Sequence, residues 1–283
     1  MLKNKLIGCS VLLGAILALT GCATKSQVER SSNTPSLPVE RSLNTTSWGY
    51  QNVAEPVRAG KKSQRFEVRK GDCGEDVGWS DCNNDRERSE VWIKNLIYPE
   101  TDMWFSWSLF IPQDFKSGMK VKTTVGQIHQ RGIVRVGENS TAGGFPSFPP
   151  LLQIDIRGDC FGATYHKITR GPTTLGDEPQ YECMTTLEEI RGKWTDVVVH
   201  FDSHQNNGIL EFFINGDSKR IIKNPVLLVP DDFYLKYGIY RSFVTREHPN
   251  IMPTQIVYFD EVRMGKTRMD VDAQLNPQLK PVD

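Results

Sequence analysis

Polar side chains with catalytic potential occur in three short segments that alternate with apolar residues. The segments read Arg-Ser-Glu at 88–90, Gln-Ile-His at 127–129 and Tyr-Leu-Lys-Tyr-Gly-Ile-Tyr-Arg at 234–241. Residues two apart in a β-strand point to the same face of the sheet. The alternation predicts that most of these polar residues share one open face, while apolar residues between them face a core: Val91, Ile128, Leu235 and Ile239.

The side chains on this face could carry out an elimination on an acidic sugar. Such cleavage needs a group that neutralises the carboxylate, a base for the proton at C5 and an acid for the oxygen leaving C4. We assign the base to His129 and the acid to Tyr240. Gln127 and Arg88 are assigned to the carboxylate. In an alternative arrangement one tyrosine is both base and acid, and His129 neutralises or orients the sugar.

Four further residues of these segments are assigned to substrate binding. Lys236 is expected to contact a carboxylate or sulfate, and Glu90 to hold Arg88 in place. Tyr234 and Arg241 are expected to add further contacts. The competing interpretation is structural, since Arg88 and Glu90 could simply form an ion pair. We retain a structural interpretation for the four histidines outside these segments: His166, His200, His204 and His248.

The three segments resemble motifs of the jelly-roll polysaccharide lyases, a group that includes alginate lyases, glucuronan lyases and heparin lyase I. Alginate lyases carry R-[ST]-E, Q-[IV]-H and Y-F-K-x-G-x-Y strands, which these segments match in order and rough spacing. The resemblance covers about residues 64–268. It implies a lyase that cleaves a uronic-acid polysaccharide by β-elimination.

Two positions depart from the alginate lyase pattern. Trp92 stands where alginate lyases usually have a second arginine, and Arg241 follows Tyr240 in place of Asn-Gln. The Gly-Ile-Tyr-Arg ending is more similar to heparin and glucuronan lyases. Because the motif strands carry few basic residues, we expect an unsulfated uronate polymer as the substrate.

The rest of the chain predicts an all-β fold. Strand-like runs separated by turns are typical of a β-sandwich, here a concanavalin-like jelly roll with a concave substrate cleft. Asn207-Gly208 predicts a hairpin between residues 195–201 and 209–214. Only residues 186–191 and 230–233 indicate short helices or turns. Residues 131–150 have the Gly, Ser and Pro content of a loop, and we expect it to overhang the cleft.

The N-terminus predicts export and lipidation. Two lysines, an apolar run over 6–19 and Leu-Thr-Gly-Cys form a lipoprotein signal over residues 1–21, with Cys22 as the lipidated residue. The apolar run is short for a transmembrane span. Residues 22–60 are rich in Ser, Asn, Thr and Pro, so we expect a flexible tether. The catalytic domain is then expected over 61–283, anchored at the outer membrane.

The four remaining cysteines favour disulfides, because an even number in an exported domain is usually paired. Neighbours in sequence suggest Cys73 with Cys82 and Cys160 with Cys183, although four cysteines allow three pairings. A zinc site is the rival interpretation, but no C-x-x-C pair supports it. We therefore predict no metal in the active site and no cofactor. Structural calcium stays open because of the acidic segment 72–85.

The charge balance limits the partners. Loss of the two lysines in residues 1–21 leaves 32 basic residues against 34 acidic ones. The mature chain therefore has no net positive charge that would attract nucleic acid. We expect a monomer that binds an acidic polysaccharide in a local cleft. A glycoside hydrolase is one alternative, but the nearest segment to its paired carboxylates, 153–158, lacks both glutamates. A non-catalytic carbohydrate-binding lipoprotein is the other, although the full set of catalytic side chains favours an enzyme.

Overall fold

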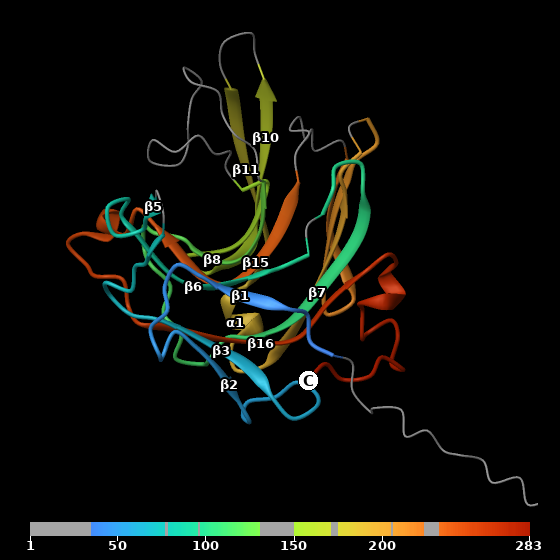
Figure 1. The fold of residues 1–283 in the computed structure, drawn as a ribbon, viewed down its shortest axis with the longest axis horizontal. Coiled ribbons are helices and arrows are strands. Elements are labelled where there is room, and N and C mark those ends of the chain that lie inside the picture. Colours follow the sequence, from blue (N-terminus) through green and yellow to red (C-terminus); the bar gives the residue numbers. More distant parts are fainter. Residues whose placement is uncertain are drawn as a thin grey trace, which may run out of the picture. The chain divides into compact units, whose positions relative to one another are not determined.

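The computed structural model describes residues 35–283 apart from 77–78, 96, 131–149, 171–174, 205 and 224–231. Most of the described residues belong to two seven-stranded antiparallel sheets that pack against each other (Figure 1). The prediction of an all-β jelly-roll sandwich is confirmed. We call the two layers the cleft sheet and the back sheet.

The cleft sheet holds the three motif segments on adjacent strands. In spatial order it contains β1 (Val39–Ser42), β6 (Arg86–Ile93), β15 (Phe233–Ser242), β8 (Thr123–Gln130), β9 (Leu152–Arg157), β10 (Cys160–Arg170) and β11 (Leu175–Thr186). Strand β15 lies between β6 and β8, so segments that are far apart in sequence become neighbours.

The back sheet contains none of the three motif segments. Its spatial order is β14 (Asp217–Lys223), β13 (Ile209–Ile214), β12 (Trp194–Asp202), β7 (Asp102–Phe110), β16 (Gln255–Gly265), β3 (Ser63–Val68) and β2 (Tyr50–Val53). A two-stranded pair, β4 (Glu75–Asp76) with β5 (Trp79–Ser80), is separate from both layers. The short helical turns are α1 (Leu187–Ile190), η1 (Val244–Glu247) and η2 (Arg268–Asp270).

The alternating apolar residues of both sheets meet in one hydrophobic core. Tyr237 of the cleft sheet packs on Phe66 and Phe259 of the back sheet, with ring centres 5.7 and 5.1 Å apart. Val91, Ile128 and Ile239, predicted to face the core, are all fully buried there. Since their motif neighbours alternate with them, the opposite face of the cleft sheet carries the motif residues Arg88, Glu90, Gln127, His129, Tyr234, Lys236 and Tyr240.

Several local predictions are confirmed. Strands β12 and β13 form the antiparallel hairpin expected around Asn207-Gly208. Helix α1 lies within the predicted segment 186–191 and begins with a capping box between Thr186 and Glu189. Both suggested disulfides, Cys73–Cys82 and Cys160–Cys183, are present. The predicted loop lies outside the described residues except for its last position.

The prediction of a flexible tether over residues 22–60 is wrong for its described part. Strand β1 pairs with β6 in the cleft sheet, and β2 pairs with β3 in the back sheet. Arg58 also forms a salt bridge with Asp196 at 3.0 Å. Polar composition was misleading here, because edge strands expose much of their surface and need few apolar residues.

The predicted signal peptide and Cys22 lie outside the described residues. Within residues 35–283, apart from the gaps given above, no helix has the length and apolar character needed to span a bilayer. The same described residues contain no group of three or more His, Cys, Asp or Glu side chains arranged to hold a metal ion.

Candidate active site on the cleft sheet

Strands β6, β15 and β8 bring the predicted catalytic residues onto one face. In the pairing register, Lys236 of β15 lies between Trp92 of β6 and Gln127 of β8. Tyr234 is opposite His129 at one end of this arrangement. At the other end Tyr240 is opposite Arg88. The polar groups therefore form a continuous strip along β15.

A distortion of β15 sets the position of Tyr240 along this strip. The pairing of β15 with β8 shifts register between Tyr237 and Tyr240, and Gly238 in between has φ of +130°. A Cβ atom on Gly238 would lie 2.3 Å from the backbone oxygen of Ser89, which no side chain tolerates. Glycine is therefore required for β15 to approach β6 this closely.

Arg88 lies beneath the open face rather than on it. Its side chain is 7% exposed and donates from Nε and Nη2 to both carboxylate oxygens of Asp81, and from Nη1 to Glu90 at 3.2 Å. Glu90 and Asp81 outweigh the effect of burial and raise the pKa of Arg88. The guanidinium carbon is 4.6 Å from the ring centre of Tyr240. Arg88 therefore supports Tyr240, and its nitrogens are already committed to carboxylates.

Gln127, Glu90 and Lys236 form a buried polar network in the middle of the strip. Gln127 donates from Nε2 to Glu90 at 2.6 Å, and its Oε1 has no partner among the described residues. Lys236 Nζ donates to Ser42 Oγ at 3.1 Å and lies 3.9 Å from Glu90 Oε2. One N–H of Gln127 and part of the Lys236 ammonium are thus available to a ligand.

His129 is half-buried, and among the described residues its Nε2 atom has no hydrogen-bond partner, which leaves it available for proton transfer. Nδ1 lies 2.8 Å from the backbone oxygen of Gln130, so Nδ1 carries the hydrogen and Nε2 the lone pair. Burial lowers the pKa of His129 to about 3, and the charges of Lys236 and Arg88 add to this effect. The ring also stacks on Tyr234, with centres 5.3 Å apart. His129 is therefore a neutral imidazole, fixed in orientation.

Two other groups have pKa values that are set by the same surroundings. Burial lowers the pKa of Lys236 to about 8, with a further contribution from Arg88, against the opposing effect of Glu90. Burial raises the pKa of Tyr240, although Arg88 and Arg86 partly oppose the shift. Near neutral pH the strip therefore carries a protonated phenol, a neutral imidazole and an ammonium group.

A cavity of about 470 Å³ continues the strip toward the edge strand β1. Trp92, Tyr234 and Lys236 line it together with Arg41 and Ser42 of β1. The rings of Trp92 and Tyr234 meet edge to face, with centres 6.1 Å apart. Tyr234 therefore borders this cavity, and its role in substrate binding stays a prediction. Strand β1 also lines the cavity, although it was expected to be part of a tether.

The prediction that Arg241 binds substrate is wrong. Arg241 is fully buried and points away from the strip, with Nη1 donating to the backbone oxygen of Pro253 at 2.5 Å and Nη2 forming an ion pair with Glu87. Strand alternation explains this position, because Arg241 follows Tyr240 directly and must face the other way. Arg241 ties β15 to its neighbours inside the sandwich.

The remaining histidines lie elsewhere. His200 of β12 stacks on Trp104 of the back sheet at 4.1 Å and contacts Asp102 at 2.7 Å. His204 contacts Asp202 at 2.5 Å. His166 belongs to β10, two strands away from His129, and His248 caps η1. The structural interpretation of these four residues stays a prediction.

Sequence reasoning missed Asp81, as it missed Arg41 and Ser42 of β1. Asp81 is fully buried, holds Arg88 through both carboxylate oxygens, and accepts a hydrogen bond from Trp79 Nε1 at 2.9 Å. The Cys73–Cys82 disulfide closes the loop that carries it. The available signal was an acidic residue next to a cysteine in a short closed loop, seven positions before a motif arginine.

Comparisons with known proteins agree with this architecture. A polysaccharide lyase family model matches residues 22–263, so the chain belongs to the polysaccharide lyase family. Its class of activity is that of a polysaccharide lyase, and the enzyme prediction is confirmed at that level. No curated protein sequence matches the chain.

Solved structures of lyases share the fold. An endo-β-1,4-glucuronan lyase from the fungus Trichoderma reesei is 19% identical, with a TM-score of 0.63 over 81% of this chain and 90% of its own. The family 7 alginate lyase A1-II′ in complex with a product is 13% identical, with a TM-score of 0.51 over 78% of this chain and 84% of its own. At these identities the similarity establishes the jelly-roll fold.

Proposed function

We propose that this lyase cleaves a uronic-acid polysaccharide by β-elimination on the strip formed by β6, β15 and β8. His129 Nε2 takes the proton from C5, and the electrons of that C–H bond form the C4–C5 double bond. The C4–O bond breaks, and the Tyr240 hydroxyl protonates the departing oxygen. The products are a new reducing end and an unsaturated non-reducing end, and solvent then restores the proton to Tyr240 and removes it from His129.

The protonation states of the two residues support these roles. A base must be unprotonated, and burial with the nearby cations keeps the pKa of His129 low, at about 3. An acid must be protonated, and burial raises the pKa of Tyr240. Environments that push two titratable groups in opposite directions in this way are typical of an acid–base pair. The same pairing disfavours the alternative in which Tyr240 serves as both groups.

Gln127 and Lys236 are suited to the developing charge on the uronate carboxylate. The second N–H of Gln127 can donate to a carboxylate oxygen, and Lys236 supplies a positive charge beside it. Arg88 is proposed to act through Tyr240, because its N–H groups contact Asp81 and Glu90. Glu90 accordingly orients Gln127 and Arg88 rather than contacting the substrate.

The observation that carries the proposal is the fixed tautomer of His129 in the same strip as Gln127 and Tyr240. The test is incubation of the protein with a panel of acidic polysaccharides, read by ultraviolet absorbance of unsaturated ends. We expect unsaturated product from an unsulfated uronate polymer. Reducing ends without unsaturation would instead indicate a hydrolase, and binding without any cleavage would indicate a carbohydrate-binding protein. A preference for heparin over every unsulfated polymer would contradict the substrate assignment.

We also propose that the protein is an exported lipoprotein anchored through Cys22. The Leu-Thr-Gly-Cys sequence after an apolar run supports lipidation, and two disulfides suit an oxidising compartment. In cells supplied with labelled palmitate, the wild-type chain should incorporate label and Cys22→Ser should not. Equal labelling of both chains would exclude this anchor.

A further inference from the structure

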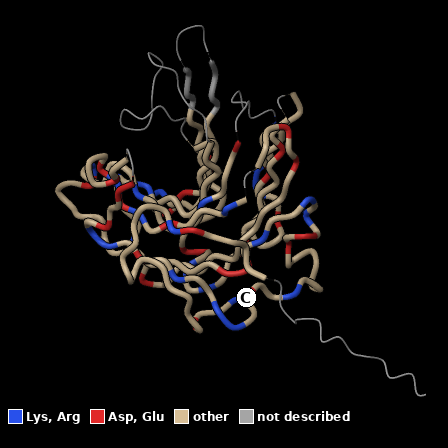
Figure 2. Tube along the Cα trace, in the orientation of Figure 1, with Lys and Arg blue, Asp and Glu red and all other residues tan. Residues whose placement is uncertain are grey.

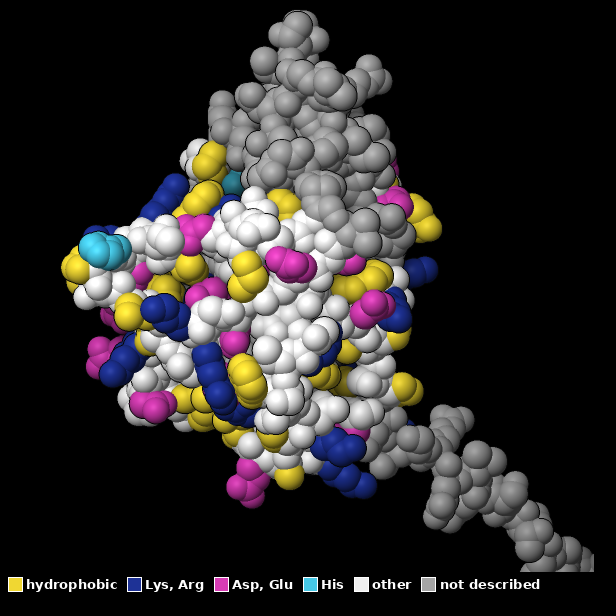
Figure 3. Space-filling model, turned by 60° about the vertical axis from the view of Figure 1, so that its left-hand side comes forward, with side chains coloured by type: hydrophobic (Ala, Val, Ile, Leu, Met, Phe, Trp, Pro, Cys, Tyr) yellow, Lys and Arg dark blue, Asp and Glu magenta, His cyan; other side chains and the backbone are white. Residues whose placement is uncertain are grey.

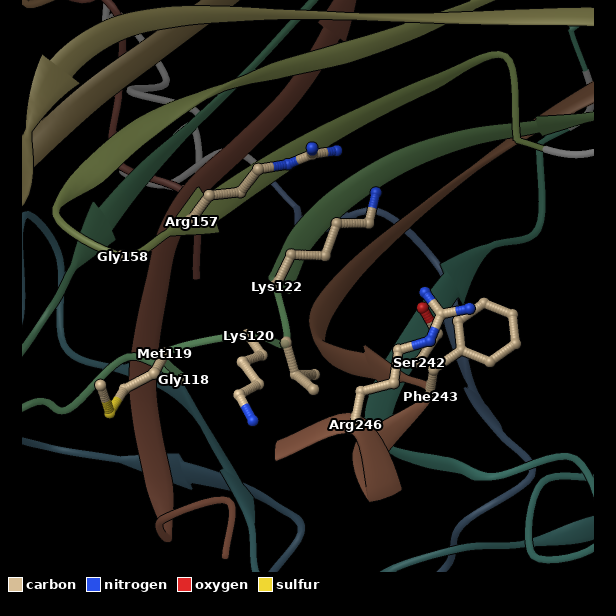
Figure 4. A pocket seen from close by; sticks show the side chains of 10 residues that line it. Gly118, Met119, Lys120, Lys122, Arg157, Gly158, Ser242, Phe243 and Arg246 are labelled. Carbon is tan, nitrogen blue, oxygen red and sulfur yellow. The ribbon is translucent and has the colours of Figure 1, made fainter. Parts of the chain in front are cut away.

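A basic pocket lies beyond Tyr240, at the opposite end of the strip from the β1 cavity. It has a volume of about 300 Å³ and is bounded by three separate segments: residues 118–122 just before β8, the end of β9 with the first residue of the turn after it, and the end of β15 with η1. Figure 4 shows Lys122, Arg157 and Arg246 around the same open space, with Arg246 beside the ring of Phe243. Ser242, two residues after Tyr240, lines it as well.

Basic residues in this pocket outnumber the acidic ones nearby. Lys120, Lys122, Arg157 and Arg246 line it, and none of the lining residues is acidic. Beneath them, the fully buried Asp155 pairs with Lys122 at 2.9 Å and with Arg157 at 3.5 Å. A second acid, Glu247, is occupied by three backbone N–H groups of residues 119–121. Among the described residues Arg246 forms no ion pair and is exposed.

This concentration of charge is local. The sequence contains equal numbers of basic and acidic residues. Figure 2 shows the two signs interspersed along the described strands, and Figure 3 shows the same mixture on one face of the molecule. A pocket lined by four cations therefore stands out from its surroundings as an attractive place for an anion.

Phe243 fixes the cations at the rim. Its ring is 41% exposed, and the guanidinium carbons of Arg86 and Arg246 lie 3.9 and 4.0 Å from the ring centre. Its backbone has φ of +59°, the left-handed region that a bulky side chain rarely adopts. Such strain tends to persist at ligand sites, where surrounding contacts hold it. The strained backbone keeps the ring, and with it Arg246, at the mouth of the pocket.

We infer that this pocket is a distal subsite for a carboxylate of the polymer, away from the bond that is cleaved. This inference rests on the proposed function, because it extends the same bound chain past Tyr240. Lys122 is two residues before Thr124, the partner of Tyr240 on β8, so the pocket continues the strip. With the β1 cavity at the other end, the protein contacts substrate on both sides of the catalytic groups, which suits internal cleavage of long chains.

The test compares Arg246→Ala with Lys266→Ala, which removes an exposed cation directly after β16 of the back sheet. Arg246→Ala should raise KM for a long uronate polymer about tenfold, which corresponds to the loss of one charge-assisted hydrogen bond. The KM of this variant should also depend less on salt concentration than that of wild type. KM for the shortest cleaved oligosaccharides should not change, and Lys266→Ala should match wild type on both. Phe243→Ala should resemble Arg246→Ala, and Phe243→Tyr should restore wild-type behaviour, since the aromatic ring positions Arg246.

The outcomes separate this inference from the proposed function. If wild type forms no unsaturated product, the proposed function fails. If wild type is active and Arg246→Ala affects short and long substrates equally, or neither, the distal subsite is wrong. A sulfated and an unsulfated form of the same polymer distinguish the anion: a KM effect on both supports carboxylate recognition, and an effect on the sulfated form alone overturns it.

Discussion

Both sheets carry buried charged residues on the face away from the core, but among the described residues these groups are covered on the back sheet and left open on the cleft sheet. On the back sheet, Asp196 accepts hydrogen bonds from Arg58, Ser108 and Gln274, at 2.6–3.2 Å. Two of these donors come from outside the strands: Arg58 lies in the connection between β2 and β3, and Gln274 follows β16, the last strand of that sheet. The carboxylate of Asp196 is thus satisfied by the chain itself.

On the cleft sheet the same kinds of residue keep unused capacity. Gln127 Oε1 has no partner among the described residues, and His129 Nε2 has a lone pair because Nδ1 carries the hydrogen. The comparison teaches that polar residues on a sheet face do not by themselves identify a site. A site is indicated where buried groups are held in position and still have hydrogen-bonding capacity left for a ligand.

The largest expected difference is in catalysis. His129→Ala should lower kcat about 10²–10⁴-fold, because it removes the general base. His200→Ala is the matched control on the back sheet, where the ring contacts Asp102, and it should leave kcat unchanged. Unsaturated product formation measures both, and thermal unfolding should show that both variants stay folded. Equal activity of His129→Ala and wild type would remove His129 from the mechanism.

Gln127→Ala should have the next largest effect. Loss of one donor to a developing oxyanion typically lowers kcat about 10²–10³-fold, and the polymer should still bind. The control is Gln274→Ala, which removes an amide from the covered face of the back sheet. Single-turnover rates with a binding measurement check this separation. A large loss of binding with an unchanged rate would assign Gln127 to ground-state recognition.

Asp196→Ala should destabilise the protein through the back sheet and leave the catalytic residues of the cleft sheet unaffected. The change leaves Arg58, Ser108 and Gln274 without their acceptor and should lower the free energy of unfolding by about 3 kcal/mol. The kcat/KM of the folded protein should match wild type. Denaturant unfolding together with activity at low temperature gives both quantities, and a catalytic defect without destabilisation would contradict the comparison.

Lys236→Ala should produce the smallest kinetic change, visible mainly in pH and salt dependence. Burial lowers the pKa of Lys236 to about 8, so its charge is present below that pH and lost above it. Wild-type kcat/KM should therefore fall above about pH 8, and remain level in mildly acid solution because the pKa of His129 is about 3. The Lys236→Ala variant should lose the fall in kcat/KM above pH 8. The pKa of its His129 should rise, because the nearby positive charge is gone. A wild-type profile with an acid limb near pH 6.5, the ordinary histidine value, would refute this account.

The fold and the open face were predictable because both depend on alternation. The apolar residues between motif positions had to face a core, so the motif residues had to share the other side, and the same rule argues against Arg241 as a ligand. Strand β14 was not predicted, since it is an exposed edge strand with almost no apolar period. Strands β1 and β2 were predicted to be part of a flexible tether for a related reason. Their segments are short and polar, and they become strands only by pairing with β6 and β3 in the folded chain.

Contacts between distant segments were beyond the reach of the sequence. The bidentate ion pair between Asp81 and Arg88 depends on how the loop 73–82, closed by a disulfide, folds next to β6. The pocket at Arg246 depends on three segments that are more than thirty residues apart in sequence and converge only in the folded chain. Neither feature leaves a local pattern in the sequence. The spacing of side chains could therefore predict the catalytic residues, but not the residues that hold them in place.

The central claim is that the open face performs an elimination with Tyr240 as the acid. The most direct test is the release of unsaturated ends from a cleaved uronate polymer by wild type and by Tyr240→Phe, which keeps the ring over Arg88 and removes only the hydroxyl. We predict unsaturated product from wild type and a rate about 10²–10⁴-fold lower from Tyr240→Phe, with unchanged thermal stability. An equally active Tyr240→Phe protein would contradict the mechanism.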